Sequence, residues 1–275
     1  MGVVSLLYII TQIGYIMTEI IVAGRVIELL YFIAFVLVTR YFIQRTKTGW
    51  MPSFRHIPAL YAIDEIVGRA VEMGRPIHVA PGLGDLDPQS IVGFEIVRYT
   101  AENAAKKGAE IIATTRSTVQ LPIIEDLVRT SFIGAGIPEA YKPENVRFIA
   151  SDVSAYVTGV QSIIERENCA GNISVGQSSG YMFMLFARAK TVVGDVMQIG
   201  GTAKVLNTPH LVATCDYVLI GEELYAAQAY LTKEPELLAT VAVQDMFKLA
   251  MMALLAIGLI VTAIGSDLIT NILGW

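Results

Sequence analysis

The sequence predicts an α/β protein with a doubly wound, Rossmann-like parallel sheet of about six strands, flanked by N- and C-terminal transmembrane helices. Two observations predict this fold class. Short apolar runs alternate with amphipathic helical segments through the middle of the chain, and long apolar runs occupy both ends. The alternation favours a parallel sheet covered by helices on both faces. The apolar ends favour a membrane anchor.

The composition supports a membrane protein with an ordinary globular middle. Of the 275 residues, 54% are hydrophobic and only 16% are charged, whereas roughly 25% are charged in typical soluble domains. The net charge of −5 and the lack of a basic stripe argue against a nucleic-acid partner. The two cysteines, Cys169 and Cys215, are too few for a disulfide framework and are expected to be small core side chains.

Two apolar runs are long enough to cross a bilayer. Residues 26–43 match a hydrocarbon core of ~30 Å, and Arg45 and Lys47 follow them directly. Residues 246–265 form the second run, with Lys248 at its start. By the positive-inside tendency, the domain between the runs is expected to be cytoplasmic. The protein is therefore expected in the cell membrane, with membrane lipid as a partner.

The first 24 residues leave the number of spans open at two or three. They are also apolar, and no polar loop separates them from residues 26–43. One straight helix over residues 3–43 would be ~60 Å long, twice the membrane thickness. Three ionisable residues in this zone, Glu19, Arg25 and Glu28, are candidates for ion pairing within the membrane. These side chains would either snorkel to the interface at a membrane boundary near residue 24 or pair between the subunits of an oligomeric membrane bundle.

The domain organisation follows from these runs and from a proline-containing linker. The expected segments are an N-terminal membrane region of one or two helices (1–48), a linker (49–58), a cytoplasmic α/β domain (59–234), a connecting helix (235–245), a C-terminal transmembrane helix (246–265) and a short tail (266–275).

Six short apolar runs in the middle of the chain are expected to be strands. Each is followed by a segment with helical periodicity or helix-capping residues. The first of these segments has Asp87 as N-cap, Pro88 in its first turn and Gly108 at its end. The expected strands are residues 77–82, 110–115, 146–151, 172–178, 196–201 and 217–221.

Polar residues follow these strands, at the edge of a parallel sheet where ligands usually bind. Hydroxyls, helix N-termini and one arginine would suit a small anion such as a phosphate. The same residue types are also the usual helix caps, and both interpretations stay open. The candidate ligand-binding residues are Gly82, Gly84, Asp85, Thr115, Arg116, Ser117, Ser151, Asp152, Gln177, Ser178, Ser179, Thr202, Glu222 and Glu223.

The usual catalytic and cofactor motifs are absent. Gly82 and Gly84 have no third glycine at dinucleotide spacing, and the chain has no phosphate-binding GxxxxGK[ST], GxSxG or HExxH motif. No catalytic residue, metal site or cofactor is therefore assigned. Glu222 and Glu223 fit the first turn of a helix, where negative charge is favoured, but they also lie at the expected binding edge.

The second half of the chain contains four segments that carry a family resemblance: CDYVLIGEELYAAQAYL (Cys215–Leu231), GGT at Gly200, KEP at Lys233 and QDMFK before the last apolar run. They resemble a family of uncharacterised prokaryotic membrane proteins. Its members, of archaeal and Chloroflexi type, carry a domain of unknown function. The resemblance covers roughly residues 57–250 and includes PALYAIDEIVGRAVEMGRPIHVAPG. It implies an α/β domain held by terminal membrane helices. It implies no established activity and no catalytic residues.

Two functions are compatible with the sequence. The first is a self-assembling structural or scaffold component of a membrane complex, with a homo-oligomer as its assembly. The second is a membrane-tethered sensor or enzyme that binds a nucleotide or another small phosphorylated ligand at the strand ends. The absence of catalytic motifs favours the first.

Overall fold

A computed structural model describes residues 26–50, 52 and 57–263 of the chain. The chain divides into two compact units. One is formed by the chain ends, Met1–Pro52 and Pro235–Trp275, and the other by Ser53–Glu234. The second unit contains the sheet and the candidate site.

The sheet has six parallel strands in the order β3-β2-β1-β4-β5-β6, which confirms the predicted fold class. The chain starts at β1 in the centre, proceeds outward to β3, then returns to β4 beside β1 and proceeds to the other side. The junction of β1 and β4 is thus the point where the strand order reverses. The strands are β1 (Ile77–Gly82), β2 (Ile111–Thr115), β3 (Val146–Phe148), β4 (Gly171–Gln177), β5 (Met197–Thr202) and β6 (Tyr217–Ile220).

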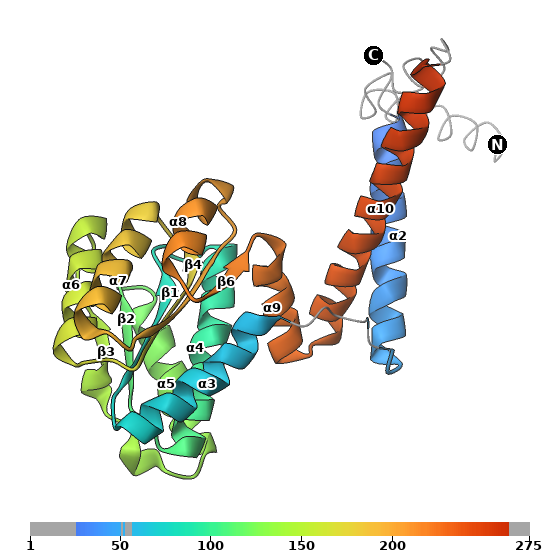
Figure 1. Cartoon of the computed structure of the whole chain (residues 1–275). Coiled ribbons are helices and arrows are strands. Elements are labelled where there is room, and N and C mark those ends of the chain that lie inside the picture. Colours follow the sequence, from blue (N-terminus) through green and yellow to red (C-terminus); the bar gives the residue numbers. More distant parts are fainter. Residues whose placement is uncertain (1–25, 51, 53–56, 264–275) are drawn as a thin grey trace, which may run out of the picture. The chain divides into compact units, whose positions relative to one another are not determined.

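Helices cover both faces of the sheet (Figure 1). Helices α3, α4, α5 and α9 pack on one face, and α6, α7 and α8 pack on the other. The bounds are α3 (Pro58–Met73), α4 (Pro88–Lys107), α5 (Leu121–Gly134), α6 (Val153–Arg166), α7 (Gly180–Val193), α8 (Thr208–Thr214) and α9 (Glu222–Thr232). Helix α4 begins as expected, with Asp87 as its N-cap, and ends at Gly108 in the left-handed conformation.

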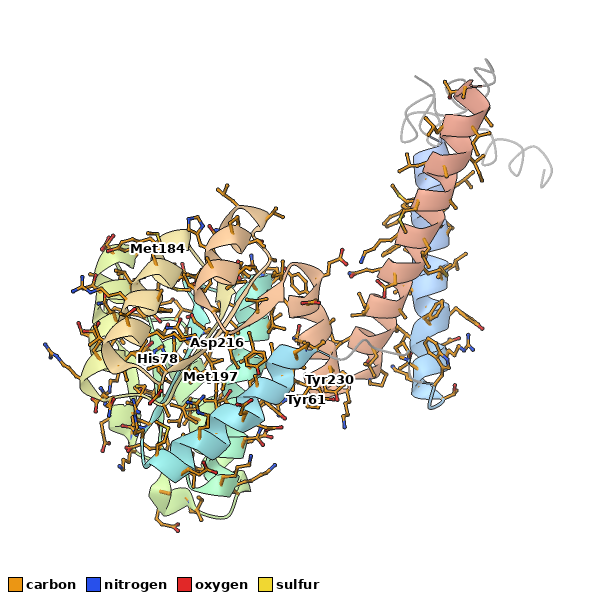
Figure 2. The ribbon with its side chains drawn as sticks, viewed as in Figure 1. Tyr61, His78, Met184, Met197, Asp216 and Tyr230 are labelled. Atoms are coloured by element: carbon orange, nitrogen blue, oxygen red, sulfur yellow. The ribbon has the colours of Figure 1, made fainter. Side chains whose placement is uncertain are left out.

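The core contains a buried polar network beside the apolar packing (Figure 2 labels His78). His78 is fully buried in β1, with Nδ1 2.8 Å from Asn172 Oδ1 and Nε2 2.8 Å from Thr114 Oγ1. The Thr114 hydroxyl in turn lies 3.0 Å from the Tyr156 hydroxyl. Burial lowers the pKa of His78 to about 4 and raises that of Tyr156 to about 12. The network therefore holds a neutral imidazole between three strands.

Strand β3 is shorter than the expected 146–151. It lies at the edge of the sheet and pairs only with β2, whose last residue is Thr115. After the hydrogen bond from Ile149 N to Thr115 O (3.1 Å), β3 has no further strand to pair with. An edge strand ends where its neighbour ends.

The other unit contains two long helices, α2 (Val26–Lys47) and α10 (Pro235–Ala263). The ring of Phe247 lies 5.3 Å from that of Tyr31 and 5.1 Å from that of Phe35, and Lys47 pairs with Glu236 at 2.6 Å. The end of α2 thus lies at the start of α10, so the helices are antiparallel (Figure 1). The expected connecting helix and C-terminal membrane helix form one continuous helix.

Both helices are long and apolar enough to cross a membrane. Most of their large apolar side chains are exposed, including Leu30, Phe32, Leu37, Leu255 and Leu259. Of the expected intramembrane ionisable residues, Glu19 and Arg25 lie outside the described residues. Glu28 lies in the first turn of α2.

Candidate functional site

The predicted site residues lie at or just after the ends of the strands, along what we call the carboxyl edge of the sheet. Gly82, Thr115, Gln177 and Thr202 are the last residues of β1, β2, β4 and β5. The others follow in the next loop or first helical turn: Gly84, Asp85, Arg116, Ser117, Ser151, Asp152, Ser178, Ser179, Glu222 and Glu223. The prediction thus selected one edge of the sheet, including the point where the strand order reverses.

The loop after β1 lies directly against the end of β4. Gly82 has φ +87°, and a Cβ there would be 2.4 Å from Gln177 O. The next amide, Leu83 N, donates to the same carbonyl at 2.5 Å. A Cβ on Gly84 would be 2.1 Å from Asp87 Oδ2. Gly82 is therefore required by its backbone conformation and by its close approach to β4, independently of any ligand, whereas a side chain at Gly84 would displace the Asp87 carboxylate.

The N-terminus of α4, where a phosphate would sit in a nucleotide-binding loop, is occupied by Asp87. Its Oδ1 accepts a hydrogen bond from Ser90 N at 2.7 Å. With the Gln177 amide oriented to satisfy both of its atoms, its nitrogen donates to Asp87 Oδ2 at 2.7 Å and its oxygen accepts from Lys204 Nζ at 2.8 Å. Asp87, Gln177 and Lys204 thereby bridge the loops after β1, β4 and β5.

Arg116, the predicted anion ligand, donates to two backbone carbonyls. Its guanidinium contacts Leu83 O, and its Nε donates to Ser151 O at 3.2 Å. The loop after β2 is therefore bonded to the loops after β1 and β3. Arg116 thus fixes the positions of these three loops relative to one another.

Gln120 makes a similar connection from inside the edge. Its side chain is fully buried and donates through Nε2 to the carbonyls of Gly84 (3.0 Å) and Asp85. Its Oε1 accepts from the Thr115 hydroxyl at 2.8 Å. The Thr115 hydroxyl in turn accepts from Ser117 N at 3.1 Å.

Two more amide side chains, which the sequence did not single out, link the other half of the edge. Gln89 Oε1 accepts from Ala203 N at 2.9 Å, and Asn207 Nδ2 donates to Ser178 O at 2.6 Å. The sequence signal that could have identified Gln89 and Asn207 is a glutamine or asparagine in the loop or first helical turn after a strand. These contacts connect residues up to 114 positions apart.

Several of the remaining predicted residues are helix caps. Asp152 accepts from Ala155 N at 2.9 Å at the start of α6, and Ser179 accepts from Met182 N at 3.3 Å at the start of α7. Glu222 and Glu223 are exposed in the first turn of α9, where their charge complements the helix dipole.

Two buried hydroxyls retain hydrogen-bonding capacity. Ser178 and Ser90, 3% and 0% exposed, have hydroxyl groups without a hydrogen-bond partner among the described residues. Within the same residues, no three His, Cys, Asp or Glu side chains lie together in a group that could hold a metal ion. Ser178 and Ser90 are therefore two buried polar groups at this edge that retain capacity for a further hydrogen bond.

The carboxyl edge also presents exposed apolar side chains, which we call the apolar row. Each of the loops or helix starts that follow β1 to β5 contributes at least one member. Val205 and Leu206 are the most exposed, at 82% and 85%. In the order of the strands across the sheet, the row consists of Val153, Val119, Leu86, Tyr181, Val205 and Leu206.

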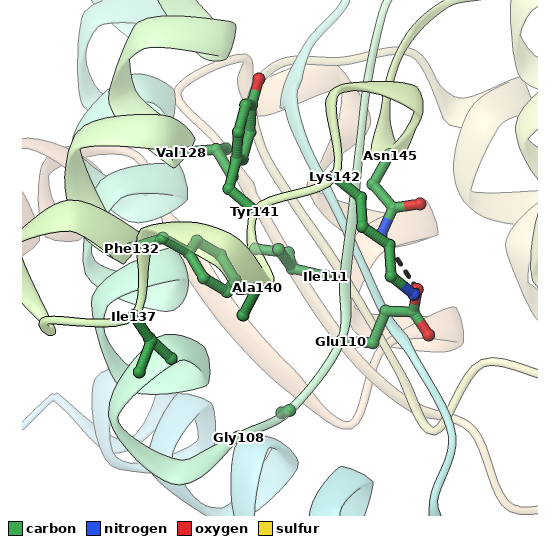
Figure 3. A pocket seen from close by; sticks show the side chains of 11 residues that line it. Gly108, Glu110, Ile111, Val128, Phe132, Ile137, Ala140, Tyr141, Lys142 and Asn145 are labelled. Atoms are coloured by element: carbon green, nitrogen blue, oxygen red, sulfur yellow. Dashed lines mark hydrogen bonds and ion pairs between the residues drawn. The ribbon is translucent and has the colours of Figure 1, made fainter.

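A pocket of about 220 Å³ lies at the opposite, amino edge of the sheet (Figure 3). Phe132, Ile137 and Tyr141 line one side, and the ion pair of Lys142 Nζ with Glu110 Oε1 (2.8 Å) lines the other. The hydrogen bond from Lys142 lowers the pKa of Glu110 and raises that of Lys142. None of the predicted site residues lines this pocket.

The comparisons with known proteins give a family and no activity. No curated protein and no solved structure matches the chain. A family model described as a domain of unknown function, DUF6754, matches residues 17–273. This match is wider than the resemblance over residues 57–250 and includes both α2 and α10. The chain therefore belongs to the DUF6754 family, whose function is not known.

Proposed function

We propose that the protein is a membrane-anchored scaffold that self-assembles through its α/β domain. In this proposal α2 and α10 span the cell membrane and the α/β domain is cytoplasmic. The exposed apolar side chains of both helices support the anchor, because they would otherwise face water. At the end of α2, the Arg45 guanidinium lies 4.7 Å from the Trp50 ring centroid, and a basic residue beside tryptophan is typical of the cytoplasmic membrane interface.

One observation carries the scaffold proposal: the loops that present the apolar row are also hydrogen-bonded to one another. The side chains of Arg116, Gln120 and Asn207 bond to neighbouring loops. Their hydrogen-bonding groups are thus engaged within the edge. Beside them the edge exposes Val205 and Leu206 at 82% and 85%, and exposed apolar side chains of this kind are typical of an interface centre.

A second copy of the chain is the partner that we infer for this surface. Anchoring confines all copies to one plane and one orientation, which raises their effective concentration. Homo-oligomers are also the commonest assemblies of soluble proteins. The expected assembly is therefore a homo-oligomer formed by cytoplasmic domains in the plane of the membrane.

Charge substitutions in the apolar row test the proposal. Leu206→Glu should shift the full chain in mild detergent to a smaller species, as measured by native mass spectrometry. Val192→Glu is the matched control, since Val192 is 61% exposed but lies at the end of α7, at the opposite edge. A monomeric wild-type protein, or equal dissociation of both variants, would contradict self-assembly through this edge.

A specific observation favours a second candidate function, the binding of a small phosphorylated ligand such as a nucleotide. Ser178 combines burial with a hydroxyl that has no partner among the described residues, and it follows β4 where the strand order reverses. Under this alternative, ATP or inorganic phosphate should raise the melting temperature of the wild type and not that of Ser178→Ala. The Asp87 carboxylate at the start of α4 weighs against this candidate because it would repel an anion.

A further inference from the structure

Helix α2 carries a groove of about 540 Å³ near its C-terminal end. Residues spaced three or four positions apart form it, so that they lie on one face of the helix. Phe35, Val36 and Ile43 supply its apolar lining, and Arg40, Gln44 and Lys47 supply its polar lining. The groove is therefore apolar at its Phe35 end and, from Arg40 to Lys47, is lined by two cationic side chains together with Gln44 and Ile43.

The cationic part contains an arginine without a protein partner. Arg40 is exposed, and no ion pair or hydrogen bond connects it to another residue of the described chain. The other two basic residues at this helix end are engaged: Lys47 pairs with Glu236 at 2.6 Å, and Arg45 stacks on Trp50. Arg40 is thus the basic side chain of this turn that is available to an external anion.

The position of Arg40 defines the chemistry of that anion. Exposed apolar residues, including Phe32, Val36 and Leu37, precede it on α2, and Lys47 follows seven residues later. At 1.5 Å per residue, this places Lys47 roughly 10 Å beyond Arg40 along the helix axis. A molecule that fits both parts has an acidic group at one end and an apolar body at the other.

We propose that this groove binds an anionic phospholipid, with its phosphate on Arg40 and Gln44 and an acyl chain along Phe35 and Val36. This proposal rests on the proposed membrane anchoring, because only then does lipid reach α2. A guanidinium binds a phosphate through two parallel N–H groups, which gives it an advantage over a lysine here. Basic pockets on the cytoplasmic side of transmembrane helices are a known mode of lipid-headgroup recognition.

Native mass spectrometry of the full chain in mild detergent, with equal amounts of phosphatidylglycerol and phosphatidylcholine added, tests the proposal. The wild type should retain phosphatidylglycerol at least fivefold over phosphatidylcholine. Arg40→Gln should reduce this ratio to about one. Arg45→Gln removes the same charge five residues further along the same helix, outside the groove, and should keep the ratio within twofold of the wild type. Circular dichroism checks that both variants retain their helices.

The outcomes separate this proposal from the proposed function. If both variants lose selectivity equally, or if neither variant loses it, the groove is not the lipid-binding site. Displacement of phosphatidylglycerol by glycerol 3-phosphate at millimolar concentration, dependent on Arg40, would identify a soluble phosphate as the ligand and overturn a lipid. Release of the protein from membranes by alkaline carbonate would refute the anchor itself. Retention in the membrane without lipid selectivity would refute only the groove.

Discussion

The phenolic oxygens of Tyr61 and Tyr230 lie 3.2 Å apart, although 169 positions of sequence separate the two residues (Figure 2). Tyr61 belongs to α3, the first helix of the α/β unit, and Tyr230 belongs to α9, the last. The chain therefore enters and leaves this unit at neighbouring places.

The tyrosine pair gives a spectroscopic prediction. The hydrogen bond with Tyr230 is the largest cause that raises the pKa of Tyr61 above its usual value. Repulsion between the two phenolates is the second. Tyr230→Phe should therefore lower the pKa of Tyr61, as measured by ¹³C NMR of the labelled ring in the full chain. Tyr181→Phe, at the carboxyl edge, serves as the control and should leave the titration unchanged. An unaltered Tyr61 titration in Tyr230→Phe would mean that the two hydroxyls do not bond in solution.

The His78 network predicts a loss of stability in acid. The pKa of His78 is lowered to about 4 by burial, whereas an unfolded histidine titrates near ~6.5. The unfolded state thus takes up a proton first as the pH falls, and folding loses free energy from pH ~6.5 down to ~4. Between pH 7 and pH 5 the loss should be about 2 kcal/mol, since one pKa unit corresponds to ~1.4 kcal/mol.

Urea unfolding of the full chain in mild detergent measures this loss. Carboxylates also begin to titrate in this range, so the useful quantity is the difference between the wild type and His78→Gln. The variant should be less stable at pH 7 but should show a pH dependence that is flatter by about 2 kcal/mol. Parallel pH profiles for the two proteins would show that His78 does not carry the effect.

Two helical glycines should respond to alanine in opposite directions. A Cβ on Gly93 in α4 would be 2.5 Å from Val175 O and 2.7 Å from Pro81 Cα, so alanine would push the helix away from the sheet. We expect Gly93→Ala to destabilise the protein by about 1–3 kcal/mol. Gly68 in α3 has no atom within 4 Å of the same position, and Gly68→Ala should stabilise it by about 0.5–1 kcal/mol. Chemical denaturation decides the signs, and a stabilised Gly93→Ala would contradict the close contact.

The fold was predictable because its signals are local. The buried strands are short, mostly apolar segments, and Asp87 and Gly108 mark the ends of α4 within a few residues of sequence. The location of the polar edge followed from topology alone, since all strands of a parallel sheet end on the same side. The continuity of α10 was not predicted, because residues 235–245 and 246–265 were expected to form two separate helices.

The bonding within the edge could not be predicted in the same way. Arg116 was expected to hold an anion, but it lies within reach of the carbonyls of Leu83 and Ser151, which are 33 and 35 positions away. Whether an arginine meets a ligand or a carbonyl depends on how closely the loops approach each other. That distance is set by glycines such as Gly82, whose contact with Gln177 is not visible in the sequence.

Gln120 gives the sharpest test of the bonded edge. Its amide donates to the carbonyls of Gly84 and Asp85 and accepts from Thr115, and its side chain is fully buried. Gln120→Glu preserves the shape but removes both donors, so a carboxylate would face two carbonyl oxygens. Because a buried polar group without a partner costs about 1–3 kcal/mol, we expect Gln120→Glu to lose at least ~2 kcal/mol of the free energy of unfolding.

Gln161→Glu is the matched control for this substitution. Gln161 is 9% exposed, and within the described part of the chain its side chain donates to Glu165, four residues along the same helix, so its replacement should cost about 1 kcal/mol or less. If the loops hold the apolar row in place, Gln120→Glu should also weaken self-association in native mass spectrometry, whereas Gln161→Glu should not. A Gln120→Glu protein with wild-type stability would show that the loops after β1 and β2 are not joined through this amide. The apolar row would then lack the rigid support that the scaffold function requires.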